Sequence, residues 1–399
     1  MPSLHDLLAR PSRLVAGLMS GTSLDGVDVV IARLEGSGPD LHVEPCAFAT
    51  YPYPDELRRL LLRNSSPATS SVRALSQLNV RLAGVYAEAV EATLGKAGLT
   101  TAELDLVGSH GQTVHHVPDA ADCAGEAVAS TLQIGDPSVL ANRLRVPVVG
   151  DFRLADMALG GEGAPLVPYF DYVYFTADDE TRLLLNLGGI ANVTLLPAGA
   201  APADVRAFDT GPANMVIDAL AERLFDEPFD PEGALAARGT VDNDLLGDLL
   251  GDDYFLRPPP KSTGRERFGA PYVDALLEAA RARGLAPEDT LATATMLTAA
   301  SVYQAYARYV RRTQAADVVI AAGGGTHNRT LMRYLEDSFA PIPVRPAADY
   351  GLDTDAKEAL CFAVLAHETI NGVPTNLPSV TGAARPTLLG KICVPFDDR

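Results

Sequence analysis

Two stretches of the sequence decide the fold: RLVAGLMSGTSLDGVDVVIARL at residues 13–34 and LLLNLGGIANVTLLP at residues 183–197. Each consists of an apolar run, a polar turn with glycine, and a second apolar run. That pattern is typical of two antiparallel strands joined by a tight turn. Because one hairpin opens each half of the chain, we expect two related halves of similar architecture.

The rest of the chain mixes helical and strand patterns. Apolar residues at helical spacing predict helices, and short apolar runs predict buried strands. Helices are expected at 55–63, 71–97, 293–310 and 355–370, strands at 104–111 and 146–152, and strand–glycine turn–helix at 316–337. We expect a surface loop at 119–130, a loop that becomes a helix at 208–224, and a basic loop at 257–269. This mixture favours α/β architecture with two lobes.

Length and charge restrict the partners. The 399 residues suit about two domains, and 47% apolar residues suit a packed globular protein. The 32 Lys and Arg against 51 Asp and Glu give a net charge of −19. Such a charge argues against nucleic acid and anionic membranes as partners, because bulk attraction is absent. An anionic ligand would have to be held by local groups.

Cysteine usage and hydropathy bear on the compartment. The four cysteines are far apart and form no CxxC pair, so neither a disulfide framework nor a zinc knuckle is expected. The N-terminal segment has scattered charges and no apolar signal core, and no run of apolar residues is long enough to span a membrane. We therefore expect a cytoplasmic protein.

Three glycine-rich turns are candidates for binding a nucleotide. GTSLDGVD at 21–28, NLGGIAN at 186–192 and GGGTHN at 323–328 each follow an apolar strand. Glycine lets the backbone approach a ligand, and consecutive amide groups can point at phosphate oxygens. A plain hairpin turn explains each stretch as well. Together, with two in opposite halves, they indicate a nucleotide held between two lobes. Neither a P-loop nor a Rossmann GxGxxG follows the first strand.

Several charged residues remain open between structural and chemical roles. Asp209 in FDTGPAN is either a turn or helix-cap residue or a general base, since a carboxylate in a polar cleft can accept a proton. His110, His115 and His116 fit no zinc pattern, so hydrogen bonding is favoured over a metal. Arg153 forms either a salt bridge or a substrate clamp.

The sequence resembles the anhydro-N-acetylmuramic acid kinases. The motifs that carry the resemblance are GLMSGTSLDGVD, GSHGQTVHH, LQIGDPSVLA, GDFRLADMALGGEGAPLVP, NLGGIANVTLL, FDTGPANMVIDA, PKSTGRERF, GGGTHNRTLM and DAKEALCFAVLAHETINGVPTNLPSVTGA. They run in family order over about residues 16–385, nearly the whole chain. The resemblance implies a two-lobed actin- and hexokinase-like fold of duplicated ribonuclease H-like domains, with an active-site cleft between the lobes. We expect the first lobe at 1–148 and 373–399, and the second at 149–372.

The resemblance also implies a reaction. Water opens the 1,6-anhydro ring at the anomeric carbon, and ATP phosphorylates the freed 6-oxygen with Mg²⁺. The products are N-acetylmuramic acid 6-phosphate and ADP, and the step belongs to peptidoglycan recycling. Partners are then small molecules only, and a homodimer is left open.

Roles follow for residues in the matching motifs. Asp209 would be the base that deprotonates the water. The ATP phosphates would be held by one loop of Gly21, Thr22, Ser23, Leu24, Asp25, Gly26, Val27 and Asp28, and by a second of Asn186, Gly188 and Gly189. Asp25 would face Mg²⁺, and Gly323, Gly324 and Gly325 would flank adenosine. Thr113, Arg153 and Glu358 would contact the sugar.

Some departures and alternatives remain. Leu154 stands where related sequences often carry a basic residue, and the stretch around Cys123 looks like a longer loop than usual. A different sugar kinase of the same fold, or a non-enzymatic nucleotide switch of the actin or chaperone type, would share the nucleotide loops. A metal hydrolase using the histidines is the third alternative.

Overall fold

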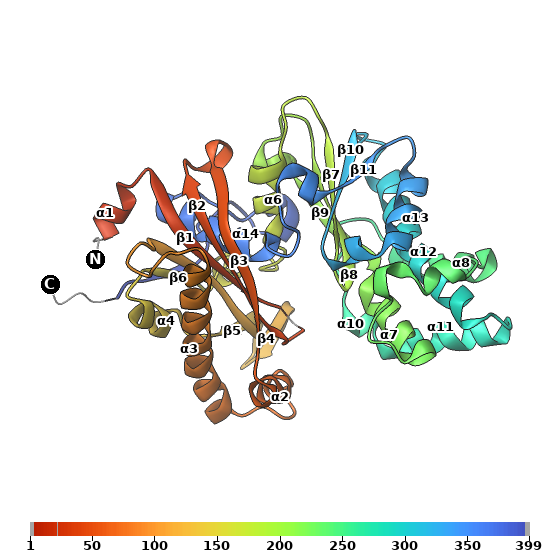
Figure 1. The fold of residues 1–399 in the computed structure, drawn as a ribbon, viewed down its shortest axis with the longest axis horizontal. Coiled ribbons are helices and arrows are strands. Elements are labelled where there is room, and N and C mark those ends of the chain that lie inside the picture. The colour runs from red at the N-terminus through yellow and green to blue at the C-terminus, as the bar shows by residue number, and fades with distance from the viewer. Residues whose placement is uncertain (1–3, 22, 396–399) are drawn as a thin grey trace. The chain divides into compact units, whose positions relative to one another are not determined.

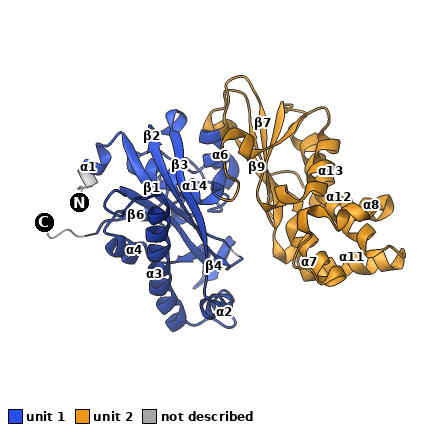
Figure 2. Cartoon of the chain, in the orientation of Figure 1, with its two compact units in different colours: residues 1–174, 356–399 blue, residues 175–355 orange. Residues whose placement is uncertain are grey.

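The chain divides into two compact units (Figures 1 and 2). A computed structural model describes residues 4–21 and 23–395. Unit 1 comprises residues 1–174 and 356–399, and unit 2 comprises residues 175–355. These boundaries differ from the expected ones at 148 and 373. Helix α14 (Lys357–Asn371) explains the second difference, because it packs on β1, β2 and β4 of unit 1.

Unit 1 is built on a sheet in the order β12-β6-β4-β1-β2-β3, with β5 paired to β4. β1 (Ser12–Ser20), β2 (Gly26–Glu35) and β3 (His42–Pro52) pair antiparallel. β4 (Leu106–Cys123) and β6 (Val148–Gly150) continue the sheet in parallel with β1. β5 (Glu126–Ile134) and β12 (Lys391–Cys393) add antiparallel edges.

Helices pack against this sheet. In α3 (Val72–Lys96), Leu78, Leu82, Tyr86, Val90 and Leu94 are buried at four-residue intervals, which explains why this segment forms one long amphipathic helix. The remaining helices of unit 1 are α1 (Leu4–Leu8), α2 (Asp55–Asn64), α4 (Pro137–Leu144), α5 (Leu154–Met157), α6 (Val167–Phe175) and α15 (Pro378–Thr381). The helices expected at 55–63, 71–97 and 355–370 are confirmed.

Glycine allows α14 to lie directly on the sheet. A Cβ on Gly17 of β1 would lie 2.0 Å from the Ala359 carbonyl oxygen, and one on Gly108 of β4 would lie 2.0 Å from that of Phe362. Because α14 touches the sheet this closely, it is buried along nearly its whole length. The Glu358 end of the helix is thereby fixed relative to β1 and β4.

Unit 2 repeats the same strand order. β9 (Arg206–Pro212), β8 (Ile190–Leu196) and β7 (Arg182–Leu187) pair antiparallel, and β10 (Val318–Ala322) and β11 (Val344–Pro346) follow in parallel with β7. The sequence β9-β8-β7-β10-β11 matches β3-β2-β1-β4-β6 in both order and direction. This confirms two copies of a ribonuclease H-like sheet.

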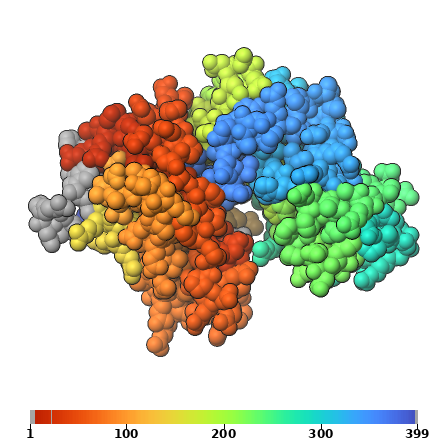
Figure 3. All heavy atoms as spheres, in the orientation of Figure 1, coloured from red at the N-terminus to blue at the C-terminus, as the bar shows by residue number. Residues whose placement is uncertain are grey.

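The helices of unit 2 are mostly contributed by residues 214–339. They are α7 (Asn214–Phe225), α8 (Asn243–Leu250), α9 (Asp253–Leu256), α10 (Arg265–Phe268), α11 (Ala270–Ala282), α12 (Pro287–Ala305) and α13 (Arg329–Phe339). Helices α7 to α11 form the block of green and turquoise atoms in Figure 3. The helix expected at 293–310 is present, although its last turn, Tyr306–Val310, is a π-helix.

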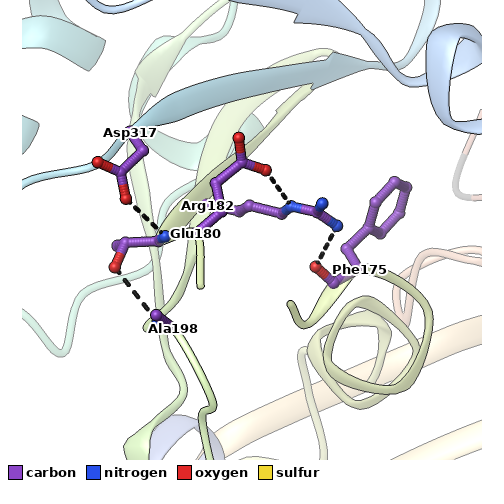
Figure 4. A network of polar contacts seen from close by, with 6 residues as sticks. Phe175, Glu180, Arg182, Ala198 and Asp317 are labelled. Carbon is purple, nitrogen blue, oxygen red and sulfur yellow. Dashed lines mark hydrogen bonds and ion pairs between the residues drawn. The ribbon is translucent and has the colours of Figure 1, made fainter. Parts of the chain in front are cut away.

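A polar network fixes the start of the central strands of unit 2 (Figure 4). Arg182 donates to Glu180 Oε2 at 2.8 Å and to the Phe175 carbonyl at 2.8 Å. The Thr181 amide donates to Asp317 Oδ2 at 2.8 Å, so β7 is tied to the residue before β10. The Ala198 amide closes the network on Thr181 Oγ1 at 3.2 Å.

Two expectations about local structure are wrong. Residues 119–130 do not form an irregular loop, because β4 and β5 pair across them as a long hairpin that turns at Ala124 and Gly125. Residues 206–212 are strand β9 rather than a loop, because they add an edge to β8. Residues 119–130 gain order from cross-strand hydrogen bonds rather than from buried apolar side chains, whereas β9 also buries Phe208 in the core of unit 2. Within residues 4–21 and 23–395, no helix combines the length and the apolarity needed to cross a membrane.

Candidate active site

The turn between β1 and β2 has a strained and tightly packed backbone. Leu24 has φ +57°, in the left-handed region, and a Cβ on Gly26 would lie 2.4 Å from the Tyr51 carbonyl oxygen. The Tyr53 amide donates to the Asp25 carbonyl at 2.8 Å, and Ser23 Oγ donates to Asp25 Oδ1 at 2.7 Å. These contacts hold residues 23–26 of the turn in place, with the Asp25 carboxylate exposed.

The predicted phosphate loop at 21–28 is only partly available to a ligand through side chains. Leu24 and Val27 are buried in the core of unit 1, so these two could contact a ligand only through their backbone. Asp28 is half-buried and accepts a hydrogen bond from Thr50 Oγ1 at 2.5 Å. Thr22, also predicted to bind phosphate, lies outside the described residues.

Gln112 supports this turn and was not singled out from the sequence. Its amide Nε2 donates to the Gly21 carbonyl at 2.9 Å, and its side chain is fully buried. Gln112 follows His110 in the GSHGQT motif, on the strand next to β1. A buried amide in a strand that runs beside a glycine turn is a signal that could have identified it. The motif thus contributes to the shape of the first predicted phosphate loop.

The three predicted sugar contacts all belong to unit 1. Arg153 follows β6, Thr113 lies on β4, and Glu358 lies in the first turn of α14. Arg153 Nη2 and Nε contact His110 Nε2 at 3.0 and 3.2 Å, and Arg153 Nη1 donates to the Gly163 carbonyl at 3.2 Å. The expected lobe bounds instead place Arg153 and Glu358 in the second lobe and Thr113 in the first.

Electrostatics distinguish these residues. Burial and, to a lesser extent, the Arg153 charge together lower the pKa of His110 to about 3, so His110 is a neutral acceptor. Burial also lowers the pKa of Arg153 to about 10, while the Glu358 charge opposes that shift. Glu358 is accessible to solvent, yet desolvation by surrounding protein atoms raises its pKa, and the Asp28 charge adds to this. Thr113 Oγ1 accepts from Gln133 Nε2 at 3.1 Å.

The two predicted glycine turns of unit 2 lie next to each other. β7 and β10 are parallel neighbours, with Asn186 paired to Ala322, so the turns leave the same edge of the sheet. A Cβ on Gly323, which has φ +86°, would lie 2.9 Å from Asn186 Oδ1 and from the Leu187 carbonyl oxygen. A Cβ on Gly325 would lie 2.6 Å from Leu187 Cβ. Only glycine permits this close packing.

The start of α7 anchors the same turns. The Asn214 amide donates to the Gly188 carbonyl at 3.1 Å, and the Met215 amide donates to the Gly189 carbonyl at 3.1 Å. Asn214 Nδ2 donates to the Leu187 carbonyl at 3.1 Å. The carbonyl groups of Gly188 and Gly189 thus accept hydrogen bonds from the first residues of α7. These bonds fix the orientation of the peptide groups in the turn.

Asp209 is positioned by a bulge and by the 257–269 loop. The register between β8 and β9 shifts, so that Asn192 opposes Asp209 while Ala191 opposes Gly211. A bulge of this kind re-aims a side chain. The Thr263 amide donates to Asp209 Oδ2 at 2.9 Å, and the carboxylate is half-buried. Asp209 does not cap a helix, because α7 begins at Asn214.

The predicted residues thus form two sets. Thr113, Arg153, Glu358 and the described residues of the 21–28 turn lie in unit 1, where the Glu358 charge interacts with those of Asp28 and Arg153. Asn186, the glycines and Asp209 lie at the same edge of the sheet of unit 2. Ligands of α/β sheets bind at such edges. Among residues 4–21 and 23–395, no three His, Cys, Asp or Glu side chains gather as a metal site, so the histidine metal hypothesis gains no support.

Comparison with known sequences decides the family. The sequence profile of the family described as "Anhydro-N-acetylmuramic acid kinase" matches residues 13–395. The chain belongs to the anhydro-N-acetylmuramic acid kinase family. A relative of that name from Salinibacter ruber is 65% identical over 395 residues, covering 99% of this chain and all of the relative. Another from Caldanaerobacter subterraneus is 44% identical over 394 residues, covering 98% of this chain and all of the relative.

Solved structures are similar at much lower identity. The activator of the 2-hydroxyisocaproyl-CoA dehydratase from Clostridium difficile with bound ADPNP is 13% identical, with a TM-score of 0.43 over 90% of this chain and 95% of that chain. A ROK family glucokinase from Streptomyces griseus in complex with glucose and AMPPNP is 12% identical, with a TM-score of 0.37 over 89% of this chain and 99% of that chain.

As a member of the anhydro-N-acetylmuramic acid kinase family, this protein is a kinase. Leu154, where we expected a basic residue, is exposed, with 40% of its surface accessible. It is the first residue of the short helix α5 and directly follows Arg153.

Proposed function

We propose that this kinase converts 1,6-anhydro-N-acetylmuramic acid, ATP and water to N-acetylmuramic acid 6-phosphate and ADP, in peptidoglycan recycling. Family membership supports the reaction class. The observation that carries the proposal is the Asp209 carboxylate, held by the Thr263 amide at 2.9 Å on the sheet edge that also bears the glycine turns. A carboxylate that a backbone amide orients in this way can act as a general base towards an attacking water.

The bonds change as follows in this proposal. A water oxygen attacks the anomeric carbon, and its proton passes to Asp209. The bond between the anomeric carbon and O6 breaks, and O6 forms a bond to the γ-phosphorus as the bond to the β,γ-bridging oxygen breaks. O6 is therefore both the leaving group of one step and the nucleophile of the other. One base and well-placed donors suffice, because phosphoryl transfer depends mainly on positioning and charge stabilisation.

Each unit carries groups that suit a part of ATP. In unit 1, backbone amides of the 21–28 turn suit phosphate oxygens. In unit 2, Asn186, Gly188 and Gly189 would contact phosphate, and the close-packed Gly323–Gly325 turn would flank adenosine. Mg²⁺ is usually held by one or two carboxylates together with substrate phosphates, and the exposed Asp25 carboxylate fits that requirement. Mg²⁺ would neutralise phosphate charge.

The sugar would be bound by Thr113, Arg153 and Glu358. Arg153 donates to two neutral acceptors, the His110 ring and the Gly163 carbonyl, so its positive charge is not neutralised by those partners. A guanidinium in this state suits the lactyl carboxylate of a muramic acid. Glu358 and Thr113 would accept and donate hydrogen bonds to hydroxyl or amide groups of the sugar. All four cysteines are free thiols, which suits a reducing compartment such as the cytoplasm.

Asp209→Asn tests the proposal. The variant should bind ATP normally by calorimetry, while turnover of the anhydro sugar falls by about 10²–10⁴-fold, as expected for loss of a general base. The exposed Asp204, shortly before β9, supplies the control variant Asp204→Asn, which should be fully active. Wild-type turnover by Asp209→Asn would rule out the role of this carboxylate.

ADP release with and without the sugar separates the remaining alternatives. Release that depends on anhydro-N-acetylmuramic acid supports the proposal, while release that responds only to another sugar indicates a different sugar kinase. Basal hydrolysis that no sugar alters indicates a nucleotide switch. Treatment with a chelator followed by Mg²⁺ alone should restore activity fully, and a requirement for a transition metal would contradict the assignment of Asp25.

A further inference from the structure

The backbone and side chain of Asp209 are held by one segment of unit 2, residues 254–263. The Asp209 amide donates to the Lys261 carbonyl at 3.1 Å, and the Thr263 amide donates to Asp209 Oδ2 at 2.9 Å. Tyr254 Oη donates to the Asp209 carbonyl at 2.9 Å. Three hydrogen bonds therefore fix this residue from one side, and all three depend on the conformation of the same segment.

Lys261 holds that segment together from inside. Its side chain is buried, with 6% of its surface accessible, which is unusual for lysine. Its Nζ donates to the Tyr254 carbonyl at 3.1 Å and lies 4.5 Å from the centre of the Tyr254 ring and 5.7 Å from that of Tyr309. Tyr254 donates to the Asp209 carbonyl, and the Lys261 carbonyl accepts from the Asp209 amide. The Lys261 ammonium therefore links these two supports of Asp209 to each other.

We propose that Lys261 is a positioning residue for Asp209: its buried ammonium fastens Tyr254 to the 261–263 segment and so fixes the three hydrogen bonds to the base. This inference rests on the proposed function for the role of Asp209 as base, and on the contacts above for the positioning itself. Lys261 binds no substrate in this scheme. Its contribution is to hold the carboxylate where the attacking water meets it, since misplacement of about 1 Å can cost about 10²-fold in rate.

The charge of Lys261 makes the positioning depend on pH. Burial, helped by the charges of Arg257 and Arg308 and opposed by that of Asp209, lowers the pKa of Lys261 to about 8. Tyr254 and Tyr309 face the ammonium from α9 and from the π-helical turn. The ammonium is therefore present at pH 7 and is lost as the pH rises through about 8. A neutral amine donates a weaker hydrogen bond and has no cation–π attraction.

The experiment measures kcat from pH 6 to pH 9.5 in the full-length enzyme. Lys261→Met removes the charge at similar length and should lower kcat at pH 7 by roughly 10- to 100-fold. The difference in kcat between the variant and the wild type should shrink above pH 8, because the wild type then loses the same charge. Lys96→Met is the matched control, because Lys96 also lies over a tyrosine ring, that of Tyr51 in unit 1, but is exposed. It should match the wild type at every pH.

Two further variants separate positioning from a general loss of structure. Lys261→Arg keeps a cation that stays protonated over this whole pH range, so it should keep its activity above pH 8, where the wild-type rate falls. Tyr254→Phe removes only the hydroxyl that donates to the Asp209 carbonyl. It should lower kcat by less than about tenfold, a hydrogen-bond effect, and should retain the fall above pH 8. If the ratio of the wild-type kcat to the Lys261→Met kcat stays constant from pH 6 to pH 9.5, the proposal is overturned.

Amide hydrogen exchange at Asp209 tests the positioning without any substrate. In Lys261→Met this amide should exchange at least about tenfold faster than in the wild type, because the segment that accepts its hydrogen bond opens more often. Unchanged exchange would refute the positioning. Faster exchange together with a wild type that fails to phosphorylate the sugar would leave the positioning intact and refute the proposed function.

Discussion

Asp156 offers the sharpest test of how the structure holds the region around Arg153. Its carboxylate is fully buried and accepts three hydrogen bonds: Oδ1 from Asn376 Nδ2 at 2.8 Å and from Thr381 Oγ1 at 2.7 Å, and Oδ2 from the Gly163 amide at 2.8 Å. Two segments far apart in the sequence are thereby joined at one side chain. Gly163 also accepts from Arg153, so the same loop links the carboxylate to the predicted sugar contact.

Asp156→Asn should destabilise unit 1 by about 3 kcal/mol. An asparagine oxygen can keep the Asn376 and Thr381 donors, but its amide then faces the Gly163 amide, donor against donor. One hydrogen bond to a charged group, about 1.5–3 kcal/mol, is lost, and a buried N–H is left without an acceptor at about 1–3 kcal/mol. The two free-energy costs partly describe the same lost contact, so we expect a destabilisation of about 3 kcal/mol rather than their full sum. It is a large share of a typical folding free energy of about 5–15 kcal/mol.

Urea unfolding gives the measurement. The chain has no tryptophan, so far-UV circular dichroism is the signal, and exchange of α14 amides reports on unit 1 separately, since a two-unit chain need not unfold in one step. Asp151→Asn is the control, because Asp151 forms an ion pair with exposed Lys391, a kind worth about 0–1 kcal/mol. If Asp156→Asn lowers the free energy of unfolding no more than Asp151→Asn does, this account of the hydrogen bonds to Asp156 is refuted.

Three further changes have defined outcomes. Gly108→Ala should cost about 3 kcal/mol or more in urea unfolding, because its Cβ would meet a backbone carbonyl of α14 at 2.0 Å, whereas Gly95→Ala, with open space around it, should be neutral or stabilising. The NMR signals of His110 should not titrate between pH 5 and pH 8, and Arg153→Met should raise its pKa from about 3, because a neighbouring positive charge is removed. Burial raises the pKa of Asp218 to about 6, so ionisation costs stability above that pH; Asp218→Asn should stabilise the protein at pH 8 by about 1–2 kcal/mol, and the gain should vanish below pH 4.

The parts of the fold that local patterns encode were predictable from sequence. Both hairpins, the long helix at 72–96 and the glycine turns lie where apolar periodicity and turn residues indicate them. Strand β9 and the outer part of the β4–β5 hairpin were missed, because their order comes from pairing with neighbouring strands. Residues such as 119–130, small and polar, carry no local signal for a strand.

The unit boundaries and the supports of the site were missed for a related reason. α14 follows unit 2 along the chain but packs on Gly17 and Gly108, and a sequence shows these glycines without showing what lies against them. The contacts of Gln112 with the Gly21 turn and of Thr263 with Asp209 likewise join residues 91 and 54 positions apart. Motif matching identified the groups expected to do chemistry, whereas their supports follow only from the tertiary structure.

Under the proposed function, the charge distribution around Arg153 would let an acidic chain hold the carboxylate of the sugar. A net charge of −19 is a property of the whole surface, and exposed charges more than about 10 Å apart are largely screened at physiological salt. Arg153 is different, because burial already removes part of its hydration, as the lowered pKa shows. Its partners His110 and Gly163 are neutral acceptors. Since a desolvated cation gains more from an anionic ligand than a solvated one, a single such guanidinium can outweigh many distant carboxylates.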